Sequence, residues 1–446
     1  MALSGLEIYK LLPQTNCKDC GYPTCLAFAM KLAAKQAELK DCPHVSEEAA
    51  AKLAAASAPP IRLVSVQGGN GKVEVGNETV LFRHEKTFYH KPGLFLRIKD
   101  TQDEGEITEL VKRASEFNVD YVGIDLYLDG FAVEAASGDP GTFGKAVAAV
   151  RGATDKPIIL IAPQADLAQA GIDPAGGRPL LYAATEENLE AFIEVAKQSG
   201  SALAIKAESF EKLAELTEKA KDAGIEDLVL DPQPTGYLDS LEKFTILRRL
   251  ALKENYRPLG YPLISFPGAL EGVDETLLAG QHIAKYGGFI VLEEFDPAKL
   301  YALLVLRENI YTDPQKPIQV QPGVYEINNP DSDSPLMVTT NFSITYFSIA
   351  NEIEGSGWPG WLLVADAEGM SVLTAWAAGK FDAERIAKDV KTFDVESKVN
   401  HKKLILPGQV SVLSGELEEE LPGWEIMVGP REAVDIGSYL KTMWEK

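Results

Sequence analysis

The stretch Ser209–Asp231, "SFEKLAELTEKAKDAGIEDLVLD", places a helical segment directly before a short apolar strand. Leucine and alanine recur at helical spacing among the charged residues of its first part, whereas "DLVLD" is a compact apolar run. The same unit recurs on both sides of this stretch. The repetition of this unit, more than any single motif, predicts the fold of the middle of the chain.

We count eight strands between residues 93 and 312, which are "LFLRI", "YVGIDLY", "PIILIA", "LLYAA", "LAIKA", "DLVLD", "YPLISF" and "GFIVLEE". They are too apolar for a sheet with one solvated face, and helical segments separate them. The pattern predicts a (β/α)8 TIM barrel over 93–312. Such barrels carry out their chemistry at the carboxyl ends of the strands, where this chain is expected to place Asp125, Asp231, Glu293 and Glu294. Acids at these positions are also common as helix caps.

Residues 1–57 are expected to form a small helical module that contains every cysteine of the chain. Helical spacing precedes and follows the cysteine loop, and a third helix is expected to begin at Ser46. The prolines of "SAPP" (57–60) predict a hinge. Residues 58–92 are expected to be a linker and a β-hairpin, because "LVSVQ" and "KVEVGNETVLFRH" flank the turn "GGNG".

The cysteines follow the pattern C-x2-C-x4-C-x16-C, at Cys17, Cys20, Cys25 and Cys42. Four clustered cysteines in a chain without any others indicate metal ligation rather than a disulfide framework. Structural zinc sites usually use two separated C-x2-C pairs, and only one such pair occurs here. Three close cysteines with a distant one followed by proline favour a ferredoxin-type 4Fe–4S cluster, with zinc as the alternative.

Residues 313–446 are expected to form a second α/β domain, a Rossmann-like open sheet with helices on both faces. Its strands are "PLMVTTN", "GWLLVADA", "KKLILPG" and "WEIMVGP", so ligands should bind at the loops that begin at Thr339, Asp366 and Gly429. No G-x-G-x-x-G follows the first strand, which argues against a dinucleotide. His401 precedes the third strand, at the opposite edge from the ligand face, and is expected to be a solvated surface residue.

The charge balance is strongly acidic, with 43 basic and 66 acidic residues and a net charge of −23. Such a surface repels phosphate backbones and anionic lipids, so neither nucleic acid nor membrane is an expected partner. The start lacks a leader pattern and no apolar run is long enough to span a bilayer, so we expect a cytoplasmic protein. The five histidines form no spaced pair and no nucleophile motif, which argues against a hydrolytic triad.

The cysteine module "NCKDCGYPTCLAFAMKLA", joined to a barrel and a terminal α/β domain, resembles the large (gamma) subunit family of corrinoid iron–sulfur proteins. "SVL" at Ser371–Leu373 is similar to the S-x-L element of cobalamin-binding domains. The resemblance implies a methyl carrier that takes a methyl group from a methyltetrahydrofolate-dependent methyltransferase and passes it to acetyl-CoA synthase/CO dehydrogenase. It also implies a heterodimer with a smaller subunit.

The resemblance further implies two cofactors. The four cysteines would hold a 4Fe–4S cluster that reactivates Co(II) to Co(I), and a base-off corrinoid without a histidine ligand would lie over the last domain. The implied corrinoid contacts are Thr340, Tyr346, Met370, Ser371, Val372, Leu373 and Ala433, with Thr374 hypothesised beneath the ring. Two alternatives stay open: a methyltransferase whose barrel binds a pterin, and an electron-transfer or scaffold protein with a zinc site.

Overall fold

The structure is a computed structural model that describes residues 5–33, 37, 39–46, 49–50, 53, 59–121, 123–270, 272–313 and 318–444. Its contacts divide the chain into two compact units. Unit 1 comprises Met1–Phe117 and Tyr127–Tyr311, and unit 2 comprises Asn118–Leu126 and Thr312–Lys446. Within the described residues, no helix is long and apolar enough to cross a membrane.

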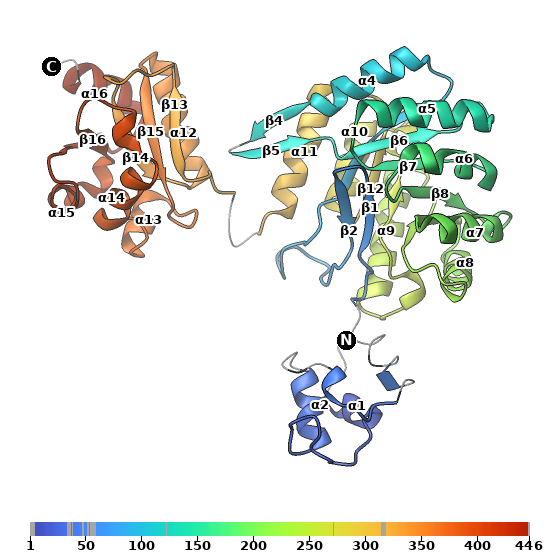
Figure 1. Ribbon diagram of the computed structural model, residues 1–446. Coiled ribbons are helices and arrows are strands. Elements are labelled where there is room, and N and C mark those ends of the chain that lie inside the picture. The colour runs from blue at the N-terminus through green and yellow to red at the C-terminus, as the bar shows by residue number, and fades with distance from the viewer. Residues whose placement is uncertain are drawn as a thin grey trace. The chain divides into compact units, whose positions relative to one another are not determined.

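Unit 1 is built around a parallel eight-stranded sheet with the order β10-β9-β8-β7-β6-β3-β12-β11 (Figure 1). A parallel bridge between Leu230 and Leu263 brings the first and last strands together, so the sheet is a nearly closed barrel. The strands are β3 (Gly93–Lys99), β6 (Gly130–Glu134), β7 (Ile158–Ile161), β8 (Leu180–Ala184), β9 (Ala202–Lys206), β10 (Leu228–Asp231), β11 (Ile264–Ser265) and β12 (Phe289–Leu292).

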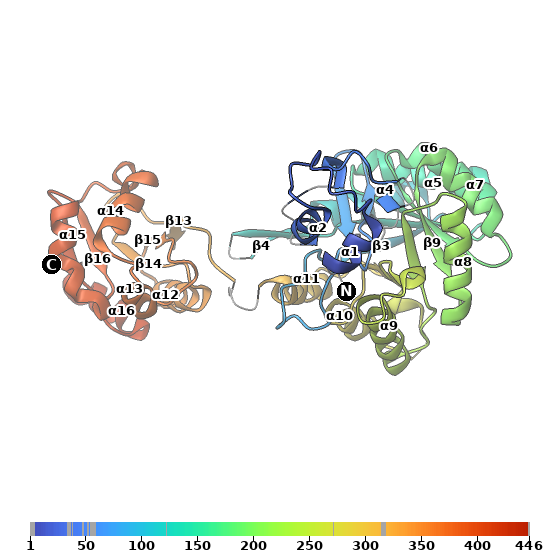
Figure 2. The ribbon, with the colours of Figure 1, turned by 90° about the horizontal axis from the view of Figure 1, so that it is seen from below.

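Helices surround this sheet, as Figure 2 shows from below. The opening stretch forms α8, which begins after Ser209; the Ser209 hydroxyl accepts the Lys212 N–H at 3.2 Å and caps the helix. Its leucines face inward because they recur at helical spacing. The helices are α4 (Glu104–Glu116), α5 (Pro140–Ala153), α6 (Ala165–Ala175), α7 (Leu189–Ser199), α8 (Phe210–Asp222), α9 (Tyr237–Leu252), α10 (Glu275–Ala284) and α11 (Pro297–Tyr311).

One predicted barrel strand is wrong. The segment "YVGIDLY" forms part of a separate two-stranded sheet, β4 (Asn118–Tyr121) and β5 (Ile124–Tyr127), in which half of the residues are exposed. The second barrel strand is instead β6, which is buried along most of its length. Asp125 therefore lies on the hairpin, where it accepts a hydrogen bond from Asn118, and not at the end of a barrel strand.

The hairpin before the barrel consists of β1 (Val64–Gln67) paired antiparallel with β2 (Lys72–Val75), so the second strand ends well before His84, the end of the predicted segment. Its valines are buried in the same core cluster as the barrel side chains Phe95 and Ile159. Because Gln67 bridges to Arg178, just before β8, the hairpin fills the amino end of the barrel. The barrel interior is therefore accessible from the carboxyl end.

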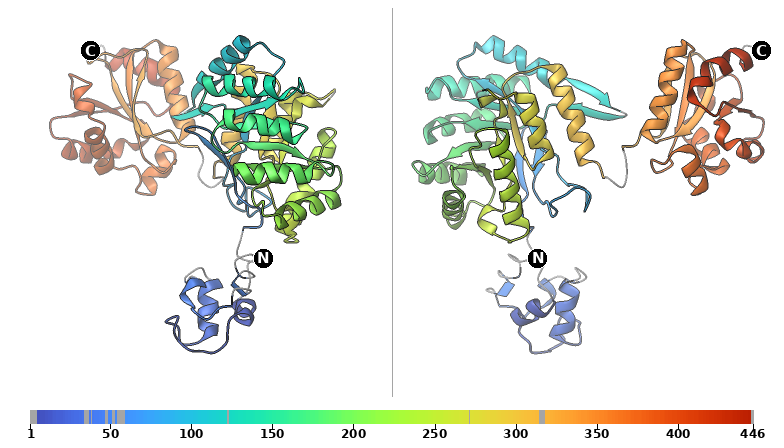
Figure 3. Two further views of the ribbon diagram at one scale, coloured as in Figure 1. Left: turned by 45° about the vertical axis from the view of Figure 1, so that its right-hand side comes forward. Right: turned by 180° about the vertical axis from the view of Figure 1, so that it is seen from behind.

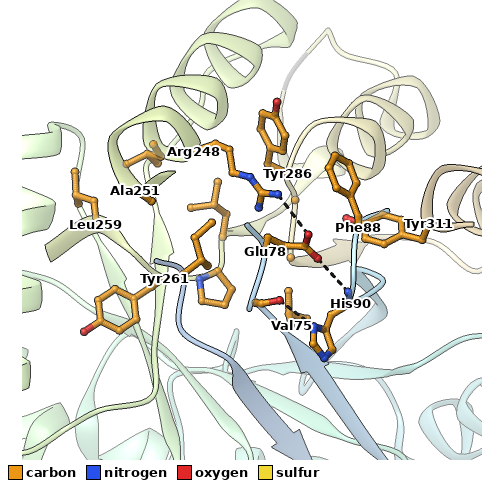
Figure 4. A pocket seen from close by; sticks show the side chains of 17 residues that line it. Val75, Glu78, Phe88, His90, Arg248, Ala251, Leu259, Tyr261, Tyr286 and Tyr311 are labelled. Atoms are coloured by element: carbon orange, nitrogen blue, oxygen red, sulfur yellow. Dashed lines mark hydrogen bonds and ion pairs between the residues drawn. The ribbon is translucent and has the colours of Figure 1, made fainter. Parts of the chain in front are cut away.

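A buried ion pair lies beside this hairpin, around a cavity of about 30 Å³ (Figure 4). Glu78 accepts hydrogen bonds from the backbone N–H groups of Tyr89 and His90, and its other oxygen lies 3.5 Å from the Arg248 guanidinium. Arg248 also donates to the Val80 carbonyl and lies over the Tyr286 ring. The cavity is large enough for one water molecule, so this pair closes the amino end rather than forming a ligand site.

Unit 2 contains a five-stranded sheet with the order β13-β15-β14-β16-β17. The four expected strands are parallel, and the additional strand β13 (Gly323–Ile327) pairs antiparallel at one edge. The other elements are β14 (Leu336–Thr340), α12 (Ser343–Ser356), β15 (Gly360–Ala365), α13 (Val372–Ala377), α14 (Ala383–Thr392), β16 (Lys403–Leu406), α15 (Ser414–Glu420), β17 (Glu425–Val428) and α16 (Ile436–Met443).

Alternate side chains of this sheet enter two separate cores. Val338 and Leu363 pack with residues of α14 and α15, whereas Met337 and Leu362 pack with residues of α12 and α16. This alternation follows from the two-residue repeat of a strand, and it places helices on both faces (Figure 3). Tyr121 of the β4–β5 hairpin contacts the core beside α12.

In the cysteine module, the expected first two helices are α1 (Gly5–Leu11) and α2 (Cys25–Ala33). The helix expected from Ser46 falls largely outside the described residues, although the Ser46 hydroxyl accepts the Ala49 N–H at 3.2 Å, as a helix cap does. The hinge expected at 57–60 also lies partly outside them, since Ser57 and Ala58 are not described.

Candidate functional site

The strand order of unit 2 creates a switch point between β14 and β16. The chain passes from β14 to β15 on one side and then crosses to β16 on the other. β14 pairs with β15 over five residues, but among the described residues it pairs with β16 only at Met337 and Ile405. The two strands therefore separate toward their carboxyl ends, which is where ligands of open α/β sheets bind.

A cavity of about 420 Å³ occupies this switch point. Five segments of unit 2 line it: Met337 and Val338 of β14, the first turns of α12, the start of α13, the end of β16 with its loop, and the loop from β17 into α16. Two of the apolar side chains at its opening are strongly exposed, Ile344 at 65% and Leu373 at 47%. The site is thus an open apolar surface with the polar groups of Ser348, Gln409 and Arg431 around it.

The structure distributes the sequence-predicted residues of this domain unevenly. Four of them, Ser371, Val372, Leu373 and Ala433, line the cavity, and Met370 is half-buried against the neighbouring core. Thr374 is exposed one turn beyond Ser371, and its hydroxyl accepts from the Ser371 hydroxyl at 3.1 Å.

Thr340 and Tyr346 lie outside the cavity lining. Thr340 is fully buried at the end of β14, and its hydroxyl lacks a hydrogen-bond partner among the described residues. Tyr346 is on α12 and packs against Tyr325, with the ring centroids 5.1 Å apart. Both stay predictions as direct contacts of a ligand.

Sequence reasoning missed several lining residues. The missed residues on α12 occupy one face of the helix, so their i, i+4 spacing after β14 could have indicated them. No comparable spacing marks the missed residues after β16. The missed residues outside the predicted loops include Ser348, Ile349, Pro407, Gln409 and Tyr439. Ile344, Thr345 and Arg431 lie in the loops predicted from Thr339 and Gly429 but had not been identified individually.

The four cysteines lie in one small hydrophobic cluster or on the loop that borders it. Cys25 and Cys42 are buried, Cys20 is half-buried, and Cys17 is exposed, and none is in a disulfide. Asn16 binds the loop to α2 because its side-chain oxygen accepts the Cys25 N–H at 2.9 Å and its own N–H is directed at the Cys25 sulfur at 3.4 Å. The role of these four thiols as metal ligands stays a prediction.

A polar group that the sequence did not reveal lies beside Cys17. The ligand atoms of Cys17, Asp19 and His44 all lie within 4.8 Å of one another, and the His44 ring nitrogen is 2.6 Å from the Asp19 carboxylate. The hydrogen bond from His44 lowers the pKa of Asp19 from its ordinary value, and a hydrogen bond from the Cys17 thiol contributes a smaller part of this shift.

A second and larger cavity, of about 1280 Å³, lies at the carboxyl end of the barrel. Asp231 is buried at the end of β10, and burial raises the pKa of its carboxyl group; the Tyr182 hydroxyl donates to it at 2.6 Å. Tyr182 packs against Phe266 with centroids 4.6 Å apart. His282 also lines this cavity; burial lowers its pKa to about 4, and its Nε2 has no hydrogen-bond partner among the described residues.

The other acids predicted at strand ends are either paired with a basic residue or exposed to solvent. Glu293 pairs with Arg97, which also binds Glu134, and Glu294 is exposed. His401 is at the amino end of β16, as expected, but the prediction that it is solvated is wrong. Its ring is half-buried against Trp444, and its Nε2 lies 2.8 Å from the Ser334 carbonyl oxygen.

Fold and sites together define a class: a multidomain α/β protein that joins a four-cysteine module to a parallel barrel and to an open sheet with a switch-point cavity. Comparison with known proteins agrees with this class. The family model "CO dehydrogenase/acetyl-CoA synthase delta subunit" matches residues 64–440, and the model "Putative Fe-S cluster" matches residues 12–44.

Full-length relatives extend this match. The corrinoid/iron-sulfur protein large subunit of Moorella thermoacetica is 44% identical over 99% of each chain. The acetyl-CoA decarbonylase/synthase complex subunit gamma of Methanopyrus kandleri is 35% identical over 98% of this chain and 97% of its own. A 7,8-dihydropteroate synthase of Vibrio fischeri superposes on 56% of this chain and all of its own with a TM-score of 0.41 and 13% identity. The chain belongs to the family of corrinoid/iron-sulfur protein large subunits.

Proposed function

We propose that the protein is a methyl carrier of the acetyl-CoA synthase complex, in which unit 2 is a Rossmann-like corrinoid-binding domain and residues 1–57 bind a 4Fe–4S cluster. The observation that carries the proposal is the apolar cavity at the switch point of a chain that also holds four clustered free thiols. Family membership supports it, because relatives are named corrinoid/iron-sulfur proteins. When bound, the corrinoid supplies a cobalt ion that exchanges a methyl group and the cluster supplies single electrons.

The lining of the cavity fits a large flat ligand with an apolar face and an amide-bearing edge. Ile344, Leu373 and Val372 would contact the ring, while Ser348, Gln409 and Arg431 offer hydrogen bonds to its substituents. An open cavity of this volume would hold one part of a corrinoid and leave the opposite face uncovered. An uncovered face suits a carrier, because donor and acceptor proteins must both reach the metal.

The cavity offers no imidazole to the ring. None of the described residues that line it is a histidine, so the chain would hold a corrinoid without a strong nitrogen donor. The Thr374 hydroxyl, which accepts from Ser371, is a weak neutral donor near the same wall. Such a lower face favours the reduced state of the metal, because a basic ligand would stabilise the oxidised states.

The cysteine module would act as a source of electrons. Cys17, at the exposed end of the thiol set, would bring one edge of the cluster close to the surface. The hinge proposed at 57–60 would let the module approach the corrinoid for reactivation and withdraw during methyl transfer. Removal of residues 1–57 should slow reactivation while methyl transfer by prereduced protein stays near normal. Loss of methyl transfer in that assay would contradict this part of the proposal.

Exposed apolar side chains in the segments next to the cavity lining support the expected partners. Val434, which follows the lining residue Ala433, is 69% exposed, Val412 is 67% exposed and Trp376 of α13 is 43% exposed. Exposed apolar side chains of this size are typical of a protein interface. We propose that a smaller subunit covers the bound corrinoid here. The methyltransferase and the acetyl-CoA synthase/CO dehydrogenase would then bind to the complex one after the other.

The direct test is a titration of the purified chain with cobinamide, a corrinoid without a lower nucleotide base, followed by absorbance. Saturable binding at one site per chain supports the proposal. A chain that leaves the cobinamide spectrum unchanged, alone and with its smaller subunit, would overturn it.

A further inference from the structure

We propose that Asn341 is a positioning residue that shapes the wall of the switch-point cavity without lining it. This inference rests on the proposed corrinoid function. Asn341 directly follows β14 and is 1% exposed. It connects the sheet to the loop that leads into the cavity wall at Ser371.

The oxygen of the Asn341 side chain binds this loop at two points. It accepts the Ala367 N–H at 2.9 Å and the Gly369 N–H at 3.0 Å. Both bonds are buried, so no water can replace them without displacing the loop. Two alternate backbone amides are therefore bound to one side-chain atom.

The nitrogen of the same side chain binds Asp366, at the start of the loop, and Gln319, which precedes β13. It donates to the Asp366 carboxylate and to the Gln319 side-chain oxygen, both at 3.2 Å. Two backbone donors and two oxygen acceptors around one amide define its orientation, because only the oxygen can accept and only the nitrogen can donate. Three of these four hydrogen bonds hold the segment Asp366–Gly369, and the fourth is to Gln319.

The loop needs such support because of its backbone. Glu368 has φ +54° and Gly369 has φ +73°, both in the left-handed region. A non-glycine residue occupies this region at a cost, which the surrounding contacts must offset. Ser371 and Val372, which line the cavity, follow within three residues. Release of the loop would therefore displace the cavity wall and with it Thr374.

Asn328 provides a matched control in the same unit. Its side-chain nitrogen donates to three carbonyl oxygens, those of Ile353, Glu354 and Trp358, at 2.9 to 3.3 Å. It follows β13 at the edge where Ile327 pairs with Gly360, the first residue of β15, which is the end of the sheet opposite to the cavity. Asn328→Ala and Asn341→Ala both remove a side-chain amide with several backbone partners, but only the second touches the loop.

Two measurements separate positioning from general stability. In ligand-free protein, we expect hydrogen exchange of the Ala367 and Gly369 amides to accelerate about tenfold or more in Asn341→Ala, the factor that one lost hydrogen bond gives. We expect cobinamide to bind this variant about tenfold more weakly and the EPR spectrum of the bound Co(II) to change. Asn328→Ala should keep wild-type exchange at these amides and wild-type cobinamide binding.

The inference is overturned if wild-type protein binds cobinamide and Asn341→Ala binds it equally well with an unchanged EPR spectrum. Equal weakening in Asn328→Ala would overturn it too, because general destabilisation would then explain the effect. If wild-type protein itself fails to bind cobinamide, the proposed function is wrong, whereas the exchange measurement on ligand-free protein still tests whether Asn341 orders the loop.

Discussion

Met337 of β14 and Ile405 of β16 form the single parallel pair that joins these two strands among the described residues. Beyond this pair the strands separate, and the cavity opens between α12 and the end of β16. The switch point, and not a sequence motif, therefore determines where unit 2 can bind a ligand.

Leu373→Asp should weaken corrinoid binding. Leu373 lines the cavity and is 47% exposed, so an acid there removes apolar contact from the ligand but little from the core. A lost leucine contact is worth about 1.5–3 kcal/mol, or roughly tenfold to a hundredfold in affinity. A cobinamide titration measures the effect. Leu277→Asp, at a 67% exposed position of α10, is the matched control and should bind normally; equal affinities for all three proteins would exclude Leu373 from the site.

Thr374→His should shift the Co(II)/Co(I) couple to a more negative potential. An imidazole beside Ser371 could donate to the lower face and stabilise the oxidised metal, which the threonine hydroxyl does not. Spectroelectrochemical titration of the corrinoid-loaded protein measures the couple. Thr392→His, on an exposed position at the end of α14, is the control. An unchanged couple in Thr374→His would show that this residue does not approach the metal.

Cys20→Ser should abolish cluster assembly. Cys20 belongs to the same cluster as the buried Cys25 and Cys42, and a four-thiolate centre is not stable with one ligand removed. Iron and acid-labile sulfide analysis of anaerobically prepared protein measures the loss. Asp19→Asn keeps every thiol and should keep its iron. Stoichiometric zinc without sulfide in the wild-type protein would contradict the iron–sulfur assignment and restore the zinc alternative.

His282 should make the protein less stable as the pH falls through the range between about 6.5 and about 4. Burial lowers its native pKa to about 4, so between these values the unfolded chain binds a proton that the native state excludes. The contribution of neutral His282 to the free energy of unfolding is fully present above pH 6.5. It decreases as the pH falls toward 4, by up to about 3 kcal/mol. Urea unfolding at pH 7 and pH 4.5 compares the wild type with His282→Asn. An identical pH dependence in the two proteins would show that His282 is not buried in its neutral form.

Glu78→Ala should destabilise unit 1 by about 3–5 kcal/mol, because it leaves the Arg248 charge buried without its partner. The cavity shown in Figure 4 is too small to hydrate that charge fully. Glu226→Ala is the control, since its pair with Arg62 is exposed and worth about 0–1 kcal/mol. Equilibrium unfolding in urea measures both. A loss below about 1 kcal/mol in Glu78→Ala would mean that solvent reaches Arg248.

The barrel could be predicted because seven of its strands are continuous apolar runs between amphipathic helices. The exception is instructive: "YVGIDLY" is the longer strand-like run, yet it forms a separate hairpin, while "GFAVE" at Gly130–Glu134 fills the barrel position. Gly130 suits this position because a side chain there would meet the Phe95 ring, but glycine carries little strand propensity and interrupts the apolar run. Local sequence therefore predicted a strand of the correct type in the wrong place.

The cavity of unit 2 was only partly predictable. The loops after β14, β15 and β17 followed from the position of the strands, and Ser371–Leu373 and Ala433 lie there. Ile344, Ile349 and Gln409 line the same cavity only because β14 and β16 are neighbours in the sheet, so their place in the site depends on the strand order. The strand order arises from the packing of helices on both faces of the sheet. No local sequence pattern in this chain encodes that order.

We propose that one chain carries both a corrinoid and an iron–sulfur cluster. Simultaneous cobalt, iron and sulfide analysis of the full chain, produced anaerobically with its smaller subunit and a corrinoid supply, tests this proposal. We expect cobalt equimolar with the chain, together with iron and sulfide each at about four per chain. Protein that contains zinc but neither cobalt nor sulfide would contradict it.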